Sequence, residues 1–270
     1  MAAKVNPFFE NTSMLTKCGA PIYKSGADKS DAEAVLFFIN SPFEPAKNHG
    51  GFFKPFGERL GLVTYSADIL PMQEPMVLPK EKVVIKKTLD FVDQIDSEYS
   101  SDVPKFLCGQ GLGSLIALKM LLQRPDFFRA GLLVSPIFEF GHKVSALQKA
   151  GLFFKKATNG SQAYMGLPDL APPNNDKSMP QHLSLGSYFQ TLTTQHECAM
   201  KSTKLKTPML WLQGEEDQIA DKDTTYRIFN DMKKVKHKKL MTVPEGGPFL
   251  LTNSQVETSK EIGNFLERLI

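Results

Sequence analysis

Five residues near the middle of the chain have the spacing of a nucleophile elbow. In that motif, G-x-S-x-G, a serine lies on a tight turn between a strand and a helix, where its hydroxyl can attack an acyl carbon. Residues 109–113 read Gly-Gln-Gly-Leu-Gly, so Gly111 takes the place of the serine. Glycine has no side chain to attack with, and it adopts a positive φ without steric cost. The pattern therefore predicts the turn without its nucleophile.

The segments around this turn predict the elements that position it. An apolar run at 106–109 predicts a buried strand, and apolar residues at helical spacing over 112–122 predict the following helix. A hairpin is expected over 14–24, and further strands at 34–39, 61–66, 130–134, 208–213 and 239–243. Helices are expected at 82–99, 223–232 and 255–270, and a loop running into a short helix over 51–60. Because strands and helices alternate, the fold class is α/β, with a doubly wound, mostly parallel sheet.

The regular alternation stops between residues 137 and 200. Prolines interrupt this region at 168, 172, 173 and 180, and only short, irregular helices are expected there. We therefore expect a core made of residues 1–136 and 201–270, with an N-terminal arm at 1–12, and an inserted cap subdomain at 137–200.

Composition narrows the class of protein. A chain of 270 residues that is 41% hydrophobic can bury one large core. Its net charge of +3 comes from 27 Lys and 5 Arg, a poor balance for nucleic-acid recognition. Three scattered cysteines, Cys18, Cys108 and Cys198, suit a reducing compartment and predict neither a disulfide framework nor a metal site. We expect no cofactor.

The sequence offers no signal for secretion or for a membrane span. The first ten residues lack an apolar run of signal-peptide length, and no stretch is long and apolar enough to cross a bilayer. We therefore expect a soluble, cytoplasmic protein, alone or within a cytoskeletal or organellar complex.

Nearly the whole chain resembles a known family. The resemblance is to the monoglyceride lipase and lysophospholipase group of α/β-hydrolases, in the serine aminopeptidase superfamily. It rests on the segment Lys82–Pro136, including Ile95, Pro104, residues 106–113, Arg124-Pro125 and the Val-Ser-Pro at 134–136. It implies the α/β-hydrolase fold and a Ser, Asp, His triad in that chain order. Members hydrolyse acyl esters of glycerol or related small acyl substrates beneath a cap.

Only one triad residue survives when the family's residues are carried over. Gly111 stands at the nucleophile position, and Asp217 matches the acid. Pro248 stands where the histidine base belongs, and proline has no proton acceptor. Pro42 falls on the oxyanion-donor position and has no N–H, a loss worth roughly 3 kcal/mol of barrier. Without a histidine to orient, Asp217 is expected to cap the following helix or to pair with a lysine.

A relocated nucleophile is the enzymatic alternative. Cys108 is expected to be buried and inert, and Ser114 to pack or cap in the first turn of its helix. His49 is the histidine nearest the altered oxyanion loop, so a pair of Ser114 or Ser41 with His49 stays open. The other histidines are His142, His182 and His196 in the expected cap and His237 before a strand.

Two features of the sequence have both a structural and a functional interpretation. The lysine-rich run 233–239 predicts a solvated corner or a docking site for an acidic protein or an anionic membrane. Large apolar residues of the cap would line an acyl pocket, fill a core or face a partner. They are Phe138, Phe140, Leu147, Leu152, Phe153, Phe154, Met165, Tyr188 and Phe189.

These observations favour a catalytically inactive α/β-hydrolase-fold protein, a pseudoenzyme that acts as a structural or interaction subunit of a larger assembly. Its partners would be other protein subunits. The alternatives are a non-catalytic acyl-lipid-binding protein and a serine hydrolase of monoglyceride or lysophospholipid type with a relocated nucleophile.

Overall fold

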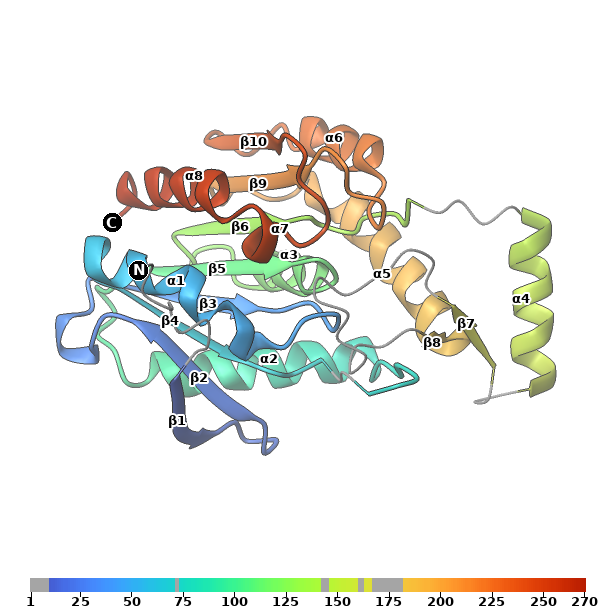
Figure 1. Ribbon diagram of the computed structural model, residues 1–270, viewed down its shortest axis with the longest axis horizontal. Coiled ribbons are helices and arrows are strands. Elements are labelled where there is room, and N and C mark those ends of the chain that lie inside the picture. The colour runs from blue at the N-terminus through green and yellow to red at the C-terminus, as the bar shows by residue number, and fades with distance from the viewer. Residues whose placement is uncertain (1–9, 71–72, 142–145, 160–162, 167–181) are drawn as a thin grey trace, which may run out of the picture.

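An eight-stranded, mostly parallel sheet runs through the centre of the computed structural model (Figure 1). The structure describes residues 10–70, 73–141, 146–159, 163–166 and 182–270. The strand order is β1-β2-β4-β3-β5-β6-β9-β10, and every pair from β4 onward is parallel. The strands are β1 Glu10–Leu15, β2 Pro21–Gly26, β3 Ala34–Ile39, β4 Leu62–Ala67, β5 Lys105–Gln110, β6 Ala130–Val134, β9 Met209–Gly214 and β10 Lys238–Val243. The predicted α/β fold with a doubly wound, mostly parallel sheet is confirmed.

Helices cover both faces of the sheet. One layer consists of α1 (Gly50–Leu60) and α8 (Gln255–Glu267), and the other of α2 (Glu81–Asp96), α3 (Gly113–Gln123) and α6 (Lys222–Asp231). Alternate residues of β3 enter the two cores, Leu36 and Phe38 on the α1 side and Val35 and Phe37 on the α2 side. Because both faces are covered, the central strands read as continuous apolar runs.

The N-terminal edge of the sheet is the predicted hairpin. Strands β1 and β2 pair antiparallel, and Gly19 in the turn between them has φ +83°. The expected extended arm at 1–12 is corrected in part, because β1 already begins at Glu10 and pairs with Lys24. Residues 1–9 lie outside the described part.

The segment between β6 and β9 holds α4 (Ala146–Asn159), β7 (Tyr164–Gly166), β8 (His182–Ser184) and α5 (Leu185–Ser202). The expectation of short, irregular helices here is wrong for α5, which has 18 residues. The four prolines precede this helix, and the Ser184 side chain caps it by accepting a hydrogen bond from the Ser187 N–H. In Figure 1, α4 stands apart from the sheet, whereas α5 runs toward it. The Cys198 thiol of α5 lies 3.6 Å from the Leu115 carbonyl oxygen of α3.

A buried ammonium joins three helices. Lys119 of α3 pairs with Glu81 of α2 at 2.5 Å and with Glu197 of α5 at 3.1 Å. Burial opposes its charge, but the bonds to the two carboxylates raise the Lys119 pKa on balance. These ion pairs hold α5 against α2 and α3, two helices of one of the layers that cover the sheet.

Lys119→Met should lower the free energy of unfolding by about 1–2 kcal/mol, because two partly buried carboxylates lose a shared cation. Urea unfolding followed by circular dichroism would measure the change. Lys201→Met is the matched control: Lys201 pairs with the same Glu197 at 3.0 Å, but its side chain is 52% exposed, so a change below about 0.5 kcal/mol is expected. Equal losses in the two variants would contradict the role given to Lys119.

Candidate functional site

The elbow turn is present, with Gly111 at its apex. Gly111 lies between β5 and α3 with φ +54°, and its N–H donates to the Val134 carbonyl at 2.9 Å. A Cβ placed on Gly111 would lie 2.8 Å from Ser41 Oγ and 3.1 Å from Ser41 Cβ. The space in which a nucleophile's side chain would begin is therefore occupied by Ser41.

A small cavity brings together the three positions that the resemblance assigns to the triad. Gly111, Asp217 and Pro248 all line it. The other lining residues are Ser41, Phe43, Gln110, Ser135, Ile137, Ile219 and Phe249, so none of the residues described around the cavity is a histidine. The space open to the centre of a water molecule is about 10 Å³, enough for about one water. An acyl ester does not fit in this cavity.

Both oxygens of the Asp217 carboxylate accept hydrogen bonds from residues close to it in the chain. Oδ1 accepts hydrogen bonds from the N–H groups of Ile219 (2.9 Å) and Ala220 (3.0 Å), and Oδ2 accepts one from Gln213 Nε2 (2.9 Å). Burial raises the Asp217 pKa, although these hydrogen bonds oppose that rise. The expectation that Asp217 caps the next helix is wrong: Asp221 caps α6 by accepting from the Thr224 N–H at 2.7 Å.

The two prolines stand in the loops that face this cavity. Pro248 lies half-buried between β10 and the short helix α7 (Leu250–Asn253), and Pro42 follows β3. The next amide after Pro42, the Phe43 N–H, donates to Ser41 Oγ at 3.4 Å. Neither proline supplies a proton acceptor or an amide donor.

A buried carboxyl group that the sequence analysis missed joins the loops around the cavity. Glu44 accepts hydrogen bonds from Gln110 Nε2 of the elbow at 2.7 Å and from Thr252 Oγ1 of α7 at 2.8 Å. Its Oε2 lies 3.7 Å from His49 Nε2. The signal was a glutamate between Phe43 and Pro45, an apolar setting that is unusual for a solvated side chain.

Burial shifts the pKa values of both members of this pair. It raises the Glu44 pKa to about 7, against the two hydrogen bonds that lower it. It lowers the His49 pKa to about 3. Both shifts favour the neutral forms, so the imidazole is uncharged and the carboxyl group is mostly protonated below about pH 7.

The residues expected for a relocated nucleophile are not paired. His49 packs against Phe38 with ring centroids 5.0 Å apart, and neither of its ring nitrogens has a hydrogen-bond partner among the described residues. Ser114 Oγ donates instead to the Gly109 carbonyl at 2.7 Å. Cys108 is fully buried in β5, and burial raises its pKa.

The other histidines in the described part of the chain lie away from this cavity. His182 Nδ1 contacts Glu74 Oε1 at 2.5 Å on the surface, and His196 and His237 are exposed. His142 lies outside the described residues.

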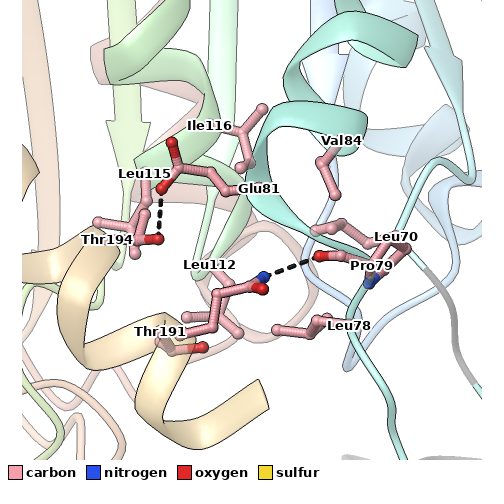
Figure 2. Close-up of a pocket in the computed structure, with 11 residues that line it drawn as sticks. Leu70, Leu78, Pro79, Glu81, Val84, Leu112, Leu115, Ile116, Thr191 and Thr194 are labelled. Atoms are coloured by element: carbon pink, nitrogen blue, oxygen red, sulfur yellow. Dashed lines mark hydrogen bonds between the residues drawn. The ribbon is translucent and has the colours of Figure 1, made fainter. Parts of the chain in front are cut away.

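A second cavity separates α2, α3 and α5 (Figure 2). Its walls are apolar, with Leu112, Leu115 and Val84 among the lining residues, and about 30 Å³ is open to the centre of a water molecule. Figure 2 shows polar side chains bonded across it: Glu81 accepts from Thr194 Oγ1 at 2.7 Å. This space holds a few waters at most and is far below the size of a lipid pocket.

The large apolar residues of the expected cap divide between core and surface. Phe138 stacks on Trp211 with centroids 5.1 Å apart, and Phe140 stacks on Tyr188 at 6.0 Å. Leu152 and Phe189 are half-buried, whereas Phe153 and Phe154 on α4 are 62% and 71% exposed. The side chains of Leu147 and Met165 lie outside the described set.

The family is settled by a sequence match that spans the turn. The profile of the family described as serine aminopeptidase, S33, matches residues 73–247. The chain belongs to this family. The match includes Gly111 and Asp217 and ends one residue before Pro248.

Relatives of this S33 family member include lipases. A monoglyceride lipase homolog of Monkeypox virus is 22% identical over 87% of this chain and 89% of its own length. The monoglyceride lipase of Mus musculus is 24% identical over 70% of this chain and 65% of its own length. The crystal structure of Paleococcus ferrophilus monoacylglycerol lipase superimposes with a TM-score of 0.74 at 17% identity, over 93% of this chain and 99% of that one. The chain is thus a monoglyceride-lipase-like α/β-hydrolase in fold.

The described residues offer neither a metal site nor a membrane-spanning helix. They contain no group of His, Cys, Asp and Glu arranged to hold a metal ion. None of the helices formed by these residues has the length and apolar character needed to cross a bilayer.

Proposed function

We propose that this S33 family member is a pseudoenzyme that does not hydrolyse acyl esters and serves as a structural or interaction subunit of a larger protein assembly. One observation carries the proposal. The cavity where a triad would meet is lined by Gly111 and Pro248 and has room for about one water molecule.

Three separate parts of acyl-transfer chemistry are affected. The nucleophile position is a glycine, the base position is a proline, and a proline follows β3 where a backbone donor would face the oxyanion. A single inactivating substitution would change only one of these parts. The combination is what long retention of the fold without selection for catalysis would produce.

The surrounding structure favours a scaffold over a binding protein for acyl lipids. The described cavities at this end of the sheet have about 10 and 30 Å³ open to a water centre, so neither holds an acyl chain. We place the core at residues 1–136 and 201–270 and the cap at 137–200. The exposed Phe153 and Phe154 of α4 give this cap an apolar surface that an assembly could bury.

Fluorophosphonate labelling of the purified full-length protein tests the inactivity. No label and no hydrolysis of a monoacylglycerol are expected, because none of the serines in the described part of the chain is hydrogen-bonded to a histidine. The mouse monoglyceride lipase serves as the positive control in the same assay. Stoichiometric labelling of Ser41 or Ser114, with turnover, would overturn the proposal.

Native mass spectrometry of the protein purified from its own cells tests the subunit role. Stoichiometric protein partners are expected. A co-purifying acyl lipid in place of protein partners would instead support the lipid-binding alternative.

A further inference from the structure

A basic groove lies on the surface between the β1–β2 hairpin and helix α2. It is lined by Lys17 and Cys18 of the hairpin turn and by Lys82, Val83, Lys86, Lys87 and Asp90 of α2. About 600 Å³ is open to the centre of a water molecule, and the groove shares no lining residue with the two cavities described above. The hairpin and α2 lie along the lower edge of the molecule in Figure 1.

The lining is strongly unbalanced in charge. Four lysines face one aspartate, a surplus of three positive charges, which equals the formal net charge of +3 of the whole chain. The groove is therefore a local surplus of positive charge in the chain, and the lysine run at 233–239 is another. A concave surface lined by one sign of charge focuses the electrostatic potential and raises the local concentration of anions.

Nearby acidic groups neutralise these lysines only in part. Asp90 pairs with Lys86 at 3.0 Å, and the Lys86 side chain is 78% exposed, so this pair is weak. Asp93, the next acid along α2, is engaged by Arg124, whose hydrogen bond lowers the Asp93 pKa, and Lys17 acts on it more weakly through space. Within the described residues, Lys17, Lys82 and Lys87 form no ion pair. Three ammonium groups that share one groove repel one another unless an anion binds between them.

We propose that this groove binds an acidic, extended polypeptide segment of a partner protein. Its volume suits several residues and greatly exceeds that of a single phosphate ion. The lining contains neither Arg nor an aromatic residue, the groups that read nucleic acids.

The lining of the groove also indicates which side chains the bound peptide segment would carry. Val83 is 42% exposed between Lys82 and Lys87 and offers one apolar contact. The best-matched segment carries several Asp or Glu residues with a small apolar side chain among them. The inference rests on the proposed function, because it names the chemistry of a partner for the proposed interaction role.

Fluorescence anisotropy with a labelled ten-residue polyglutamate peptide tests the groove. The triple variant Lys82→Gln, Lys86→Gln, Lys87→Gln should weaken binding by about tenfold, which corresponds to ~1.4 kcal/mol. The matched control changes Lys233, Lys234 and Lys236 to Gln, which removes the same charge from another exposed run. This control should weaken binding less than about twofold. Equal losses in the two triple variants would mean that only net charge matters and would overturn the assignment.

Cys18 provides a second, position-specific test. It is the exposed cysteine of the groove, whereas Cys108 and Cys198 are buried. A polyglutamate peptide with a terminal bromoacetyl group should alkylate Cys18 as the thiolate displaces bromide, and a polyglutamine peptide of equal length should react much more slowly. Equal reaction with both peptides would overturn the proposal. So would lysine-dependent binding to phosphatidylserine vesicles without binding to the peptide.

The failures of the two proposals can be told apart. Serine labelling by the fluorophosphonate would overturn the inactivity and leave the peptide results unchanged. If the lysine substitutions in the groove do not weaken peptide binding, this inference is wrong, and the proposed inactivity is unaffected.

Discussion

A Gly111→Ser variant should have no esterase activity and should be less stable than the wild-type protein by about 2 kcal/mol. Roughly half of that loss comes from placing a side chain at φ +54°, in the left-handed region. The rest comes from the new Cβ, which would lie 2.8 Å from Ser41 Oγ and must displace it. Urea unfolding gives the stability, and monoacylglycerol hydrolysis gives the activity.

Gly19→Ser is the matched control for the stability loss. Gly19 has φ +83°, and a Cβ placed there would have nothing within 4 Å, so this variant reports the backbone term alone. Adding Ser41→Gly to Gly111→Ser should recover part of the loss by removing the contact. Turnover by Gly111→Ser alone would contradict the roles assigned to Pro248 and Pro42. A loss no larger than that of Gly19→Ser would contradict the contact with Ser41.

Glu44→Gln should become more stable relative to the wild-type protein as the pH rises from about 4.5 to about 7. The folded pKa of Glu44 is raised to about 7 from 4.5, so in this window the folded state binds more protons than the unfolded state. Wild-type stability therefore falls through this window by about 3 kcal/mol on account of Glu44. The glutamine side chain of the variant cannot ionise, so the variant lacks this loss.

The difference between variant and wild type is the quantity to measure, because His49 has the opposite effect. Its folded pKa is lowered to about 3 from 6.5, so its contribution to stability is lost as the pH falls through that range. The two slopes oppose each other between about pH 4.5 and 6.5 in the wild-type protein. Subtracting urea-unfolding free energies at each pH cancels the His49 term.

Glu58→Gln, on the exposed face of α1, should leave the pH profile unchanged and serves as the control. A flat difference between Glu44→Gln and wild type would mean that water or a protonated His49 solvates the Glu44 carboxylate. The burial argument for the Glu44–His49 pair would then be wrong.

Local pattern was sufficient to predict the scaffold. The apolar runs at 34–39 and 130–134 coincide with β3 and β6, because strands buried on both faces carry their signal in consecutive residues. The turn at Gly111 was also predicted, since its glycine spacing is local. The four prolines predict a break in regular structure, but all of them precede α5, which runs uninterrupted for 18 residues.

The features that the sequence did not predict depend on contacts between segments that are far apart in the chain. Glu44, Gln110 and Thr252 come from the loop after β3, the end of β5 and helix α7, and nothing in the sequence pairs them. The lysine run at 233–239 was noticed because it is continuous, whereas the basic groove combines Lys17 with lysines of α2. Asp217 and Asp221 are four residues apart, and only the structure shows that the second one caps α6.

The place of Ser41 sets the order in which serine chemistry could return to this lineage. A serine at 111 that arose first would collide with Ser41 and weaken the fold before a histidine at 248 could make it useful. A smaller residue at 41 before the serine at 111 would avoid that loss. The route back to catalysis is therefore least costly when it begins at residue 41, with a change that by itself brings no activity.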